Sequence, residues 1–570
     1  MQRRVSLALS AILCWVGLVV FAPTFAQAQI KLVNPSVEQA PSNNITISDS
    51  ATSDNASNGT ADIKQSIAQG QTLESERRWG EALTLYEDTL RRFPRDTAIK
   101  ERLQLARIHY DLGRRYNDNS FKKSLTRLPE RDALDLYGEV LLKVQSHYVD
   151  TPNWKDLIDY STKAYLVALA DPVFVEHNLS NVSQAQVDRF SADVNQHVAA
   201  WQIANRHHAR DAVAYIARMG NEKLGLGVST TILEFTCGAT SGLDPYSTFL
   251  TADQLNEVYS QIEGNFVGLG IELKANEGSL LIVKTIVGSP AEKAGIRAGD
   301  RIVAVDNHTT ADMSTDQAAN LLQGKEGTMV DVTLQGADGK SRRLRIRREQ
   351  VDVPSIDSGR IVDKELGVAY MRLTCFQKST ARDLDTELWR LNALGMKSLI
   401  IDLRGNPGGL LGVSVEVVDR FVENGVIVST RGRGPQEDYK YSAHPQGTWK
   451  MPLVVLIDGD SASASEIFAG AIRDHRRGVI VGSRSYGKGS VQGIFPLAIG
   501  NAGLRLTTAK FLSPLNQPYS GVGVSPDLPV QTVAKPIVND NGSAQSAEVD
   551  DPALQAAVEA ARRQPQALKR

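Results

Sequence analysis

Apolar runs of strand length alternate with amphipathic segments of helix length in the last third of the chain. Val368–Leu373 and Ser398–Leu403 are apolar runs typical of buried strands, and Ala381–Leu394 between them has apolar residues at helical spacing. A further helical segment, Val413–Val422, precedes a third apolar run at Pro452–Asp458. Strands that alternate with helices predict an α/β layer with functional loops at the strand ends.

The segment before this α/β pattern, between Phe266 and Arg348, has short strands and glycine-rich turns instead. The segment contains the loop Gly268-Leu269-Gly270-Ile271, the helix start Ser289-Pro290-Ala291 and the turn Ala298-Gly299-Asp300. In this order the segment resembles a PDZ domain. The resemblance implies that backbone N–H groups of the loop bind a peptide's terminal carboxylate, while the peptide adds as a strand to the adjacent edge. A PDZ domain that serves only as a spacer is the alternative.

The first half of the chain is mainly helical. Trp79–Pro94 resembles one tetratricopeptide-type hairpin, but no second copy follows, so we expect it to pack on a neighbouring domain or a partner protein. Residues 130–262 also have apolar residues at helical spacing, and their histidines lack metal-ligand spacing. Residues 29–60 are rich in Ser, Asn, Thr and Ala and predict a disordered linker.

The N-terminus has the pattern of a secretory signal peptide. Arg3 and Arg4 precede an apolar stretch from Leu7 to Ala22, and Ala26-Gln27-Ala28 supplies a small-residue cleavage signal. The alternative is an uncleaved membrane anchor, although the stretch is shorter than the ~20 residues of a spanning helix. We therefore expect a periplasmic or secreted protein, which would associate with the membrane only if this segment stayed uncleaved.

Composition excludes several classes of protein. A chain of 570 residues predicts three or four domains, and a formal net charge of −2 argues against a dedicated nucleic-acid binder. No phosphate-binding loop, dinucleotide fingerprint or Cys/His cluster occurs, so no cofactor or metal is expected. Cys237 and Cys375 remain after signal cleavage and are expected to be buried free thiols rather than a disulfide framework.

The helix that follows Pro452–Asp458 opens with three alternating serines: Ser461, Ser463 and Ser465. A serine hydroxyl needs a base to become a nucleophile near neutral pH. His475 lies about 18 Å along the same helix, and Asp474 about 16 Å, so neither reaches the serines. Any of the three serines could instead cap the helix, and the residue pattern leaves the choice between them open.

Lys488 is the better candidate for the base. Gly487 and Gly489 flank it and permit a close backbone approach, and the apolar strand before it indicates a buried setting. Burial lowers the pKa of a lysine toward neutral pH, where its amine can accept a proton. A surface lysine is the alternative.

The serine and lysine segments together are similar to the C-terminal processing peptidases, also called tail-specific proteases. The matching motifs are Ser-Ala-Ser-Ala-Ser-Glu-Ile, Tyr-Gly-Lys-Gly-Ser-Val-Gln and Asp-Leu-Arg-x-Asn-Pro-Gly-Gly, and the resemblance covers about 131–530. The family's spacing of 25 residues before Lys488 implies Ser463 as the nucleophile. The resemblance further implies Gln492 as the residue that orients the lysine. Its oxyanion donors map to the backbone of Ala464 and of the Gly408-Gly409 pair, with Gly409 preferred.

The resemblance implies a multidomain α/β chain whose crotonase-like protease core is interrupted by the PDZ domain. An all-helical N-terminal region with the tetratricopeptide-like hairpin precedes it. The expected parts are a signal peptide (1–28), a linker (29–60), the helical hairpin (61–118), a helical domain (130–262), the PDZ domain (263–350), the α/β core (351–535) and a C-terminal linker with a helix (536–570). That last helix, Ala553–Arg562, is a candidate dimerisation element.

These features predict an exported serine endopeptidase that recognises protein C-termini through its PDZ domain and forms an acyl-enzyme. Its expected partners are polypeptides with apolar C-termini, an adaptor protein on the N-terminal helices, and further copies of the chain in a homodimer or larger homo-oligomer. The alternative is a non-catalytic adaptor with a degenerate protease core. The intact serine, lysine, glutamine and glycine positions argue against that alternative.

Overall fold

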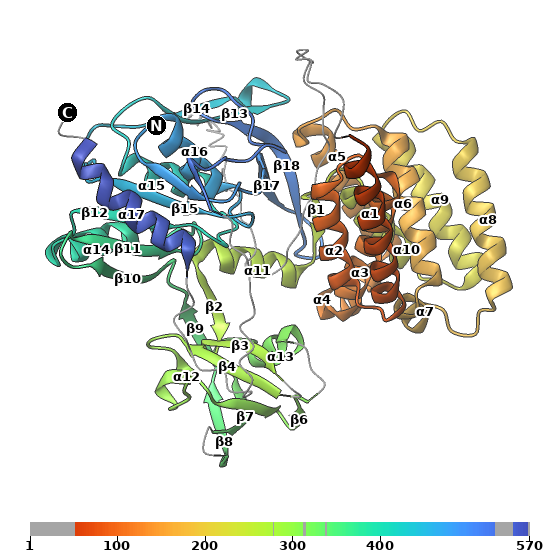
Figure 1. Cartoon of the computed structure of the whole chain (residues 1–570). Helices are drawn as coiled ribbons and strands as arrows, with labels where there is room; N and C mark the ends of the chain where they lie inside the picture. The colour runs from red at the N-terminus through yellow and green to blue at the C-terminus, as the bar shows by residue number, and fades with distance from the viewer. Residues whose placement is uncertain (1–51, 277–278, 312–314, 337–338, 531–550, 568–570) are drawn as a thin grey trace, which may run out of the picture.

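The computed structural model describes residues 52–276, 279–311, 315–336, 339–530 and 551–567 (Figure 1). A helical part lies beside an α/β part, and a smaller β-rich part lies below the α/β part. The predicted signal peptide and the first part of the predicted linker, residues 1–51, lie outside the described residues. No helix within the described ranges is long and apolar enough to cross a membrane.

Three helices open the described chain and share a core of their own. They are α1 (Thr52–Ser75), α2 (Trp79–Arg92) and α3 (Thr97–Asn117). Leu83, Tyr86 and Ile99 are among the buried residues between them. α1 begins inside the segment predicted as a disordered linker, so that prediction is wrong for residues 52–60. A helix held by a packed segment extends at little cost, even where its sequence lacks apolar periodicity.

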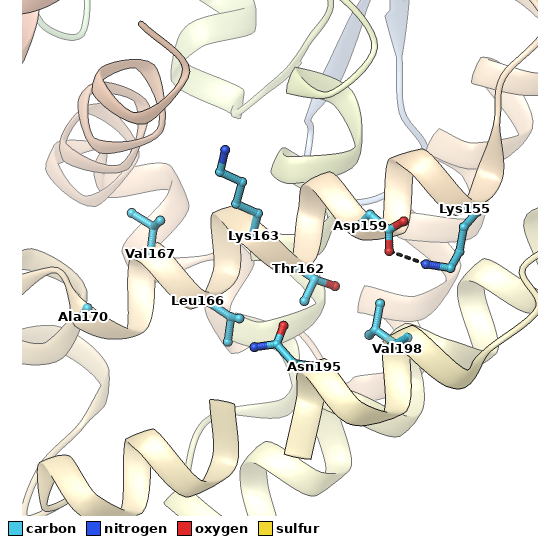
Figure 2. Close-up of a pocket in the computed structure, with 10 residues that line it drawn as sticks. Lys155, Asp159, Thr162, Lys163, Leu166, Val167, Ala170, Asn195 and Val198 are labelled. Carbon is cyan, nitrogen blue, oxygen red and sulfur yellow. Dashed lines mark hydrogen bonds and ion pairs between the residues drawn. The ribbon is translucent and has the colours of Figure 1, made fainter. Parts of the chain in front are cut away.

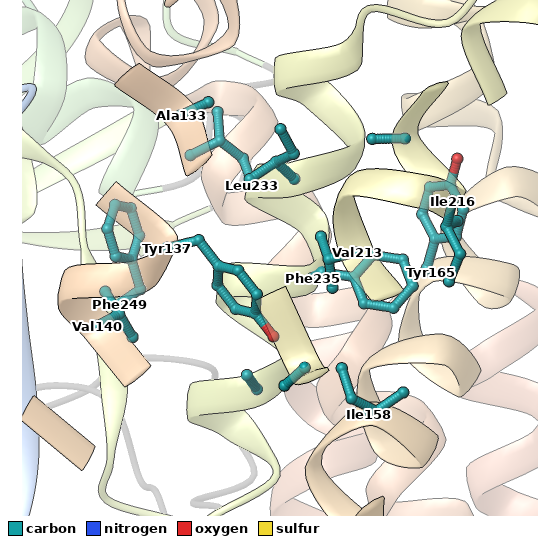
Figure 3. Close-up of a cluster of buried hydrophobic side chains, with 14 of the residues drawn as sticks. Ala133, Tyr137, Val140, Ile158, Tyr165, Val213, Ile216, Leu233, Phe235 and Phe249 are labelled. Carbon is teal, nitrogen blue, oxygen red and sulfur yellow. The ribbon is translucent and has the colours of Figure 1, made fainter. Parts of the chain in front are cut away.

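The helical domain is built around one buried helix. Its elements are α4 (Asn119–Lys123), η1 (Leu125–Arg127), α5 (Glu130–His147), α6 (Trp154–Ala170), α7 (Pro172–Asn178), α8 (Gln184–Ala200), α9 (Arg206–Leu224), α10 (Val228–Ser241) and α11 (Ala252–Glu263). α10 is buried on nearly every side, including polar residues such as Thr231, Glu234 and Thr236. Figure 3 shows its residues Leu233 and Phe235 among side chains of the surrounding helices, with Tyr137 and Tyr165 facing them.

The β-rich part is a small sheet with two short helices. Its strands are β3 (Ile271–Asn276), β4 (Ser279–Thr285), β5 (Arg301–Val305), β6 (His308–Thr309), β7 (Met329–Gln335) and β8 (Ser341–Arg347), in the order β3-β4-β5-β7-β8 with β6 on β5. The helices are α12 (Pro290–Lys293) and α13 (Thr315–Leu322). A two-stranded ribbon of β2 (Asn265–Gly268) and β9 (Glu349–Asp352) joins this part to the rest. β3 therefore lies at an edge of the sheet, close to α13.

A six-stranded sheet forms the centre of the α/β part. Its order is β10 (Ile356–Asp363), β11 (Val368–Leu373), β12 (Ser398–Asp402), β15 (Leu453–Ile457), β16 (Val479–Gly482) and β19 (Leu528–Pro529). All pairs after β10–β11 are parallel. α14 (Thr380–Ala393), α15 (Leu411–Asp419) and α16 (Ala464–Asp474) cover one face. The loops after β12 and β15 therefore meet at the same edge of the sheet, as the sequence predicts.

The C-terminal helix α17 (Pro552–Ala567) covers the opposite face of this sheet. Ala553, Ala557 and Ala561 are almost fully buried against β11, β12, β15 and β16. The alanine-rich face of this helix, a candidate dimerisation element, therefore packs within the chain.

A second sheet joins the helical domain to the α/β part. It contains β1 (Thr248–Leu250), β18 (Gly503–Leu512), β13 (Val426–Gly432) and β14 (Tyr439–Ser442) in that order, and β17 (Ser490–Pro496) pairs with β18. A short helix, η2 (Pro435–Glu437), lies between β13 and β14. Because β1 pairs with β18, the Leu243–Leu250 turn of the helical domain reaches the strands that follow Lys488.

Candidate active site

Ser463 lies at the sharp turn between β15 and α16, and 4% of its surface is exposed. Its backbone has φ 57° and ψ −114°, a conformation that residues other than glycine seldom adopt. A strained serine on a strand-to-helix turn is typical of the nucleophile elbow of hydrolases. Ser463 is also the N-cap of α16, and the strain makes it a candidate functional residue in addition.

The other two serines are held by main-chain carbonyls. The Ser461 hydroxyl donates to the Leu403 carbonyl at 2.8 Å, and the Ser465 hydroxyl donates to the Asn406 carbonyl at 2.9 Å. Both serines are fully buried. They tie the start of α16 to the loop after β12, which leaves Ser463 as the serine whose hydroxyl is not committed to a carbonyl.

Backbone donors of the loop after β12 lie beside Ser463. A Cβ atom placed on Gly408 would lie 2.7 Å from Cβ of Ser463, so the glycine permits this close approach. The Gly408 N–H donates to the Asn406 side chain at 2.8 Å and is thus occupied. The N–H groups of Gly409 and Ala464 have no acceptor in the described part of the chain. This difference supports the preference for Gly409 over Gly408.

Glu466 connects the serine to the lysine loop, and the sequence reasoning missed it. Its fully buried carboxylate accepts from the Ser463 N–H at 2.9 Å and the Lys488 N–H at 2.9 Å. It also accepts from the Ser485 hydroxyl at 2.7 Å and the Gly487 N–H at 2.6 Å. Burial raises its pKa, while these four donors favour the ionised form. Its position three residues after a serine at a helix start, as in a capping box, was the signal that could have identified it.

Lys488 follows β16 on the loop to β17, with its amine beside an aromatic ring. Lys488 Nζ lies 5.1 Å from the ring centroid of Tyr246, which belongs to the Leu243–Leu250 turn. Burial and, to a smaller extent, the positive charge of Arg505 lower the pKa of Lys488 to about 7, although the charges of Glu466 and Asp244 oppose them. An amine with this pKa is largely able to accept a proton near neutral pH. No hydrogen bond joins it to Ser463 in the described structure.

Gln492 lies on β17 with its side chain fully buried. Its Nε2 donates to the Ser490 hydroxyl at 2.8 Å, and its Oε1 is buried without a hydrogen-bond partner in the described structure. The expected contact with Lys488 is therefore not made in this arrangement. A buried orphan carbonyl oxygen is costly, so it is a ready acceptor for an amine that turns toward it.

The residues set aside by helix geometry have structural partners. His475 Nε2 lies 2.7 Å from the Val426 carbonyl oxygen, and Asp474 accepts from the Leu515 N–H at 3.3 Å. Cys237 and Cys375 are free thiols, and burial raises the pKa of Cys237 to about 12. Neither thiol therefore competes with Ser463 as a nucleophile.

The glycine loop of the β-rich part has the conformation its sequence requires. Gly270 has φ 76°, and a Cβ there would lie 2.4 Å from Cβ of Ser289. The N–H groups of Leu269 and Gly270 have no acceptor in the described structure, whereas Gly268 belongs to β2 and Ile271 to β3. These two backbone N–H donors therefore lie unpaired beside the edge strand β3, within the described structure.

A cavity of 640 Å³ lies elsewhere, between α6 and α8 (Figure 2). Its lining includes Leu166 and Val198, together with the Lys155–Asp159 ion pair of 2.5 Å. It contains neither Ser463 nor Lys488, so it is separate from the candidate catalytic residues. Within the described ranges, no group of His, Cys, Asp and Glu residues has the arrangement of a metal site.

Comparison with known proteins identifies two regions of the chain. Residues 367–530 match the model of peptidase family S41, and residues 282–336 match that of the PDZ domain. A carboxy-terminal-processing protease of Bartonella bacilliformis is 37% identical over 301 residues, which are 52% of this chain and 68% of that protein. The chain belongs to peptidase family S41. Membership places it among serine-type endopeptidases, here with a PDZ domain and a helical N-terminal region, and does not favour the non-catalytic adaptor.

Other relatives of this S41 chain carry related names. A probable CtpA-like serine protease of Staphylococcus haemolyticus is 32% identical over 289 residues, which are 50% of this chain and 57% of that protein. Among solved structures, the photosystem II D1 C-terminal processing protease is 26% identical, with a TM-score of 0.37 over 70% of this chain and 93% of that chain. The chain thus spans little more than half the length of its staphylococcal relative.

Proposed function

We propose that this S41 chain is an exported serine endopeptidase that captures protein C-termini with its PDZ domain and cleaves upstream of them. Ser463 is the nucleophile, Lys488 the general base and Gln492 the residue that orients the lysine. The oxyanion donors are the N–H groups of Ala464 and Gly409. The proposal extends to this chain what the names of its relatives say of them.

The observation that carries the proposal is the connection between serine and lysine through one carboxylate. Glu466 accepts hydrogen bonds from the backbone N–H of Ser463 and of Lys488, so it fixes the two backbones relative to each other. The hydroxyls of Ser461 and Ser465 are committed elsewhere. The remaining hydroxyl is the one beside two unpaired N–H groups, as acyl transfer requires.

The reaction proceeds through an acyl-enzyme. Lys488 Nζ leaves the ring of Tyr246, accepts the Ser463 hydroxyl proton, and Oγ bonds to the scissile carbonyl carbon. The carbonyl oxygen becomes an alkoxide that accepts from the Ala464 and Gly409 N–H groups. The C–N bond then breaks as the protonated Lys488 returns its proton to the leaving amine. Water, deprotonated by the same amine, hydrolyses the ester and restores Ser463.

Burial of the lysine makes this role feasible near neutral pH. The lowered pKa of Lys488, about 7, leaves roughly half of the amines neutral at pH 7. At an ordinary lysine pKa, only about one amine in 3,000 would be neutral at that pH. The protonated Lys488 that forms in the intermediate is still a strong enough acid to protonate the leaving amine.

Tail capture is assigned to the Gly268–Ile271 loop and the β3 edge. The N–H groups of Leu269 and Gly270 can donate hydrogen bonds to a terminal carboxylate there, and β3 can pair with the residues that precede that carboxylate. The crotonase-like character of the core, the tetratricopeptide-like character of residues 61–118, and the predicted domain boundaries remain part of this proposal. So do export, homo-oligomerisation and an adaptor that binds the N-terminal helices.

A tail-blocking experiment tests the function. The cleavage kinetics are compared for two forms of one unstructured polypeptide with an apolar C-terminus. One form has a free terminal carboxylate, and the other is amidated there. We expect the chain to cleave both upstream of the tail, with a higher KM for the amidated form because the loop at Gly268 loses its anion. Equal kinetics would refute tail capture, and no cleavage of either form would refute the endopeptidase itself.

A further inference from the structure

Helix α2 contacts the lysine loop, although it lies outside the residues that match the S41 and PDZ models. The Arg91 guanidinium carbon lies 4.9 Å from the ring centroid of Tyr486, two residues before Lys488. At this distance the cation and the ring attract each other. A helix from the N-terminal part thus forms one wall of the segment that carries the proposed base.

The contact continues from Tyr486 to the lysine amine. The side chains of Tyr486 and Tyr246 share a hydrogen bond, and Lys488 Nζ lies over the Tyr246 ring. The backbones of both tyrosines are fixed as well. The Tyr486 N–H donates to the Ser461 carbonyl at 3.0 Å, and Arg505 Nε donates to the Tyr246 carbonyl at 3.0 Å. Arg91, Tyr486, Tyr246 and Lys488 therefore form a continuous row of contacts.

A buried acid on α2 belongs to the same wall. Glu87 lies one helical turn before Arg91, so both side chains lie on one face of the helix. Glu87 is 1% exposed and pairs with Arg107 of α3 at 3.2 Å. The charge of Glu87 raises the pKa of Tyr486, and the charge of Arg91 lowers it. The face of α2 toward the lysine loop is thus a charged, specific contact rather than an incidental one.

We propose that Arg91 is a positioning residue for proton transfer: it fixes Tyr486 and, through it, the Tyr246 ring that shields the Lys488 amine from water. The inference rests on the proposed role of Lys488 as the base. It gives the N-terminal helices a part in the chemistry of this chain, in addition to any part in binding partners.

Loss of Arg91 should raise the pKa of the Lys488 amine. Burial is the largest influence on the Lys488 pKa, and the charges that act on the amine are those of Arg505, Glu466 and Asp244. Without Arg91, Tyr486 is freed and water reaches the amine. Better solvation of the charged form raises the pKa of a lysine. The proton then leaves only at higher pH.

The test is the pH dependence of Lys488 acetylation in the full chain. Acetic anhydride reacts with neutral amines, and peptide mass spectrometry follows the Lys488 peptide between pH 5 and pH 10. We expect the midpoint in the Arg91→Ala variant to rise by about one pH unit, which lowers the neutral fraction at pH 7 about five-fold. Arg92→Ala is the matched control, because Arg92 pairs with Asp62 and lies over Phe93 instead.

A second variant separates positioning from access and from folding. Tyr486→Phe keeps the ring but loses the hydroxyl, so its midpoint should also rise, and the double variant should shift less than the sum of the two. Faster acetylation at every pH with an unchanged midpoint would mean that Arg91 only blocks access, and would overturn the inference. So would identical midpoints for Arg91→Ala and Arg92→Ala. Because acetylation needs no proteolysis, failure of the proposed endopeptidase activity would appear separately, in the cleavage assay.

Discussion

The substitution Glu466→Gln tests whether one carboxylate holds the proposed nucleophile Ser463 and the proposed base Lys488 together. The carboxylate accepts four hydrogen bonds, one from the Ser463 N–H and three from the lysine loop. A glutamine of nearly the same shape has one acceptor oxygen, and its NH2 group is itself a donor. At least one of the four donors therefore loses its partner.

The size of the effect follows from the donors left unpaired. A buried donor without a partner costs about 1–3 kcal/mol. If this cost raises the activation free energy of the reaction by the same amount, kcat/KM drops about 5- to 150-fold. Part of it also falls on folding, so we expect the melting temperature to fall as well.

The assay measures kcat and KM on the free-tail polypeptide, with thermal unfolding in parallel. Since the altered contacts hold the serine and lysine rather than the tail, we expect kcat to fall and KM to stay close to wild type. Glu416→Gln is the matched control, because Glu416 is an exposed acid on α15 that makes none of these contacts. A Glu466→Gln variant with the wild-type kcat would refute the idea that this carboxylate aligns the two residues.

Three further predictions concern the base, the oxyanion donor and the C-terminal helix. Because only the neutral Lys488 amine accepts a proton and its pKa is about 7, kcat/KM should rise with pH through a midpoint near 7, and a flat profile would contradict a lysine base. Gly409→Ala places a Cβ 2.2 Å from a backbone oxygen at φ 146° and should lower kcat about 10²–10³-fold, whereas Gly412→Ala, which meets open space, should not. Asp551→Asn removes the ion pair of 2.8 Å with Arg404 and should lower the free energy of unfolding by ~1 kcal/mol at pH 7. Because this pairing lowers the Asp551 pKa, the difference should vanish in acid as the carboxylate becomes protonated, and a difference that persists there would contradict it.

The periodic parts of the fold could be predicted from the sequence, because burial imposes their pattern. β11 has the predicted bounds Val368–Leu373, and α14 lies within one residue of its prediction. The apolar alternation of a buried sheet is a local property and survives in a single sequence. The start of α1 was missed because residues 52–60 have no apolar repeat.

The sequence pointed to the residue types of the candidate site but not to the contacts between them. The choice of Ser463 rested on a family resemblance, and its physical basis is visible only in three dimensions, where Ser461 and Ser465 bond to carbonyls of a distant loop. The roles of Glu466 and Tyr246 depend likewise on residues far apart in the chain. Long-range polar contacts leave no periodic trace, so a single sequence does not reveal them.

The central claim is that the Ser463 hydroxyl attacks the substrate. The most direct measurement compares the wild type with Ser463→Ala on the unstructured polypeptide with a free apolar C-terminus, using mass spectrometry to count and map the products. The account predicts cleavage by the wild type and a loss of about 10³-fold or more in the variant, whose fold should be intact because the Ser463 N–H still bonds to Glu466. Equal turnover by the two proteins would contradict it.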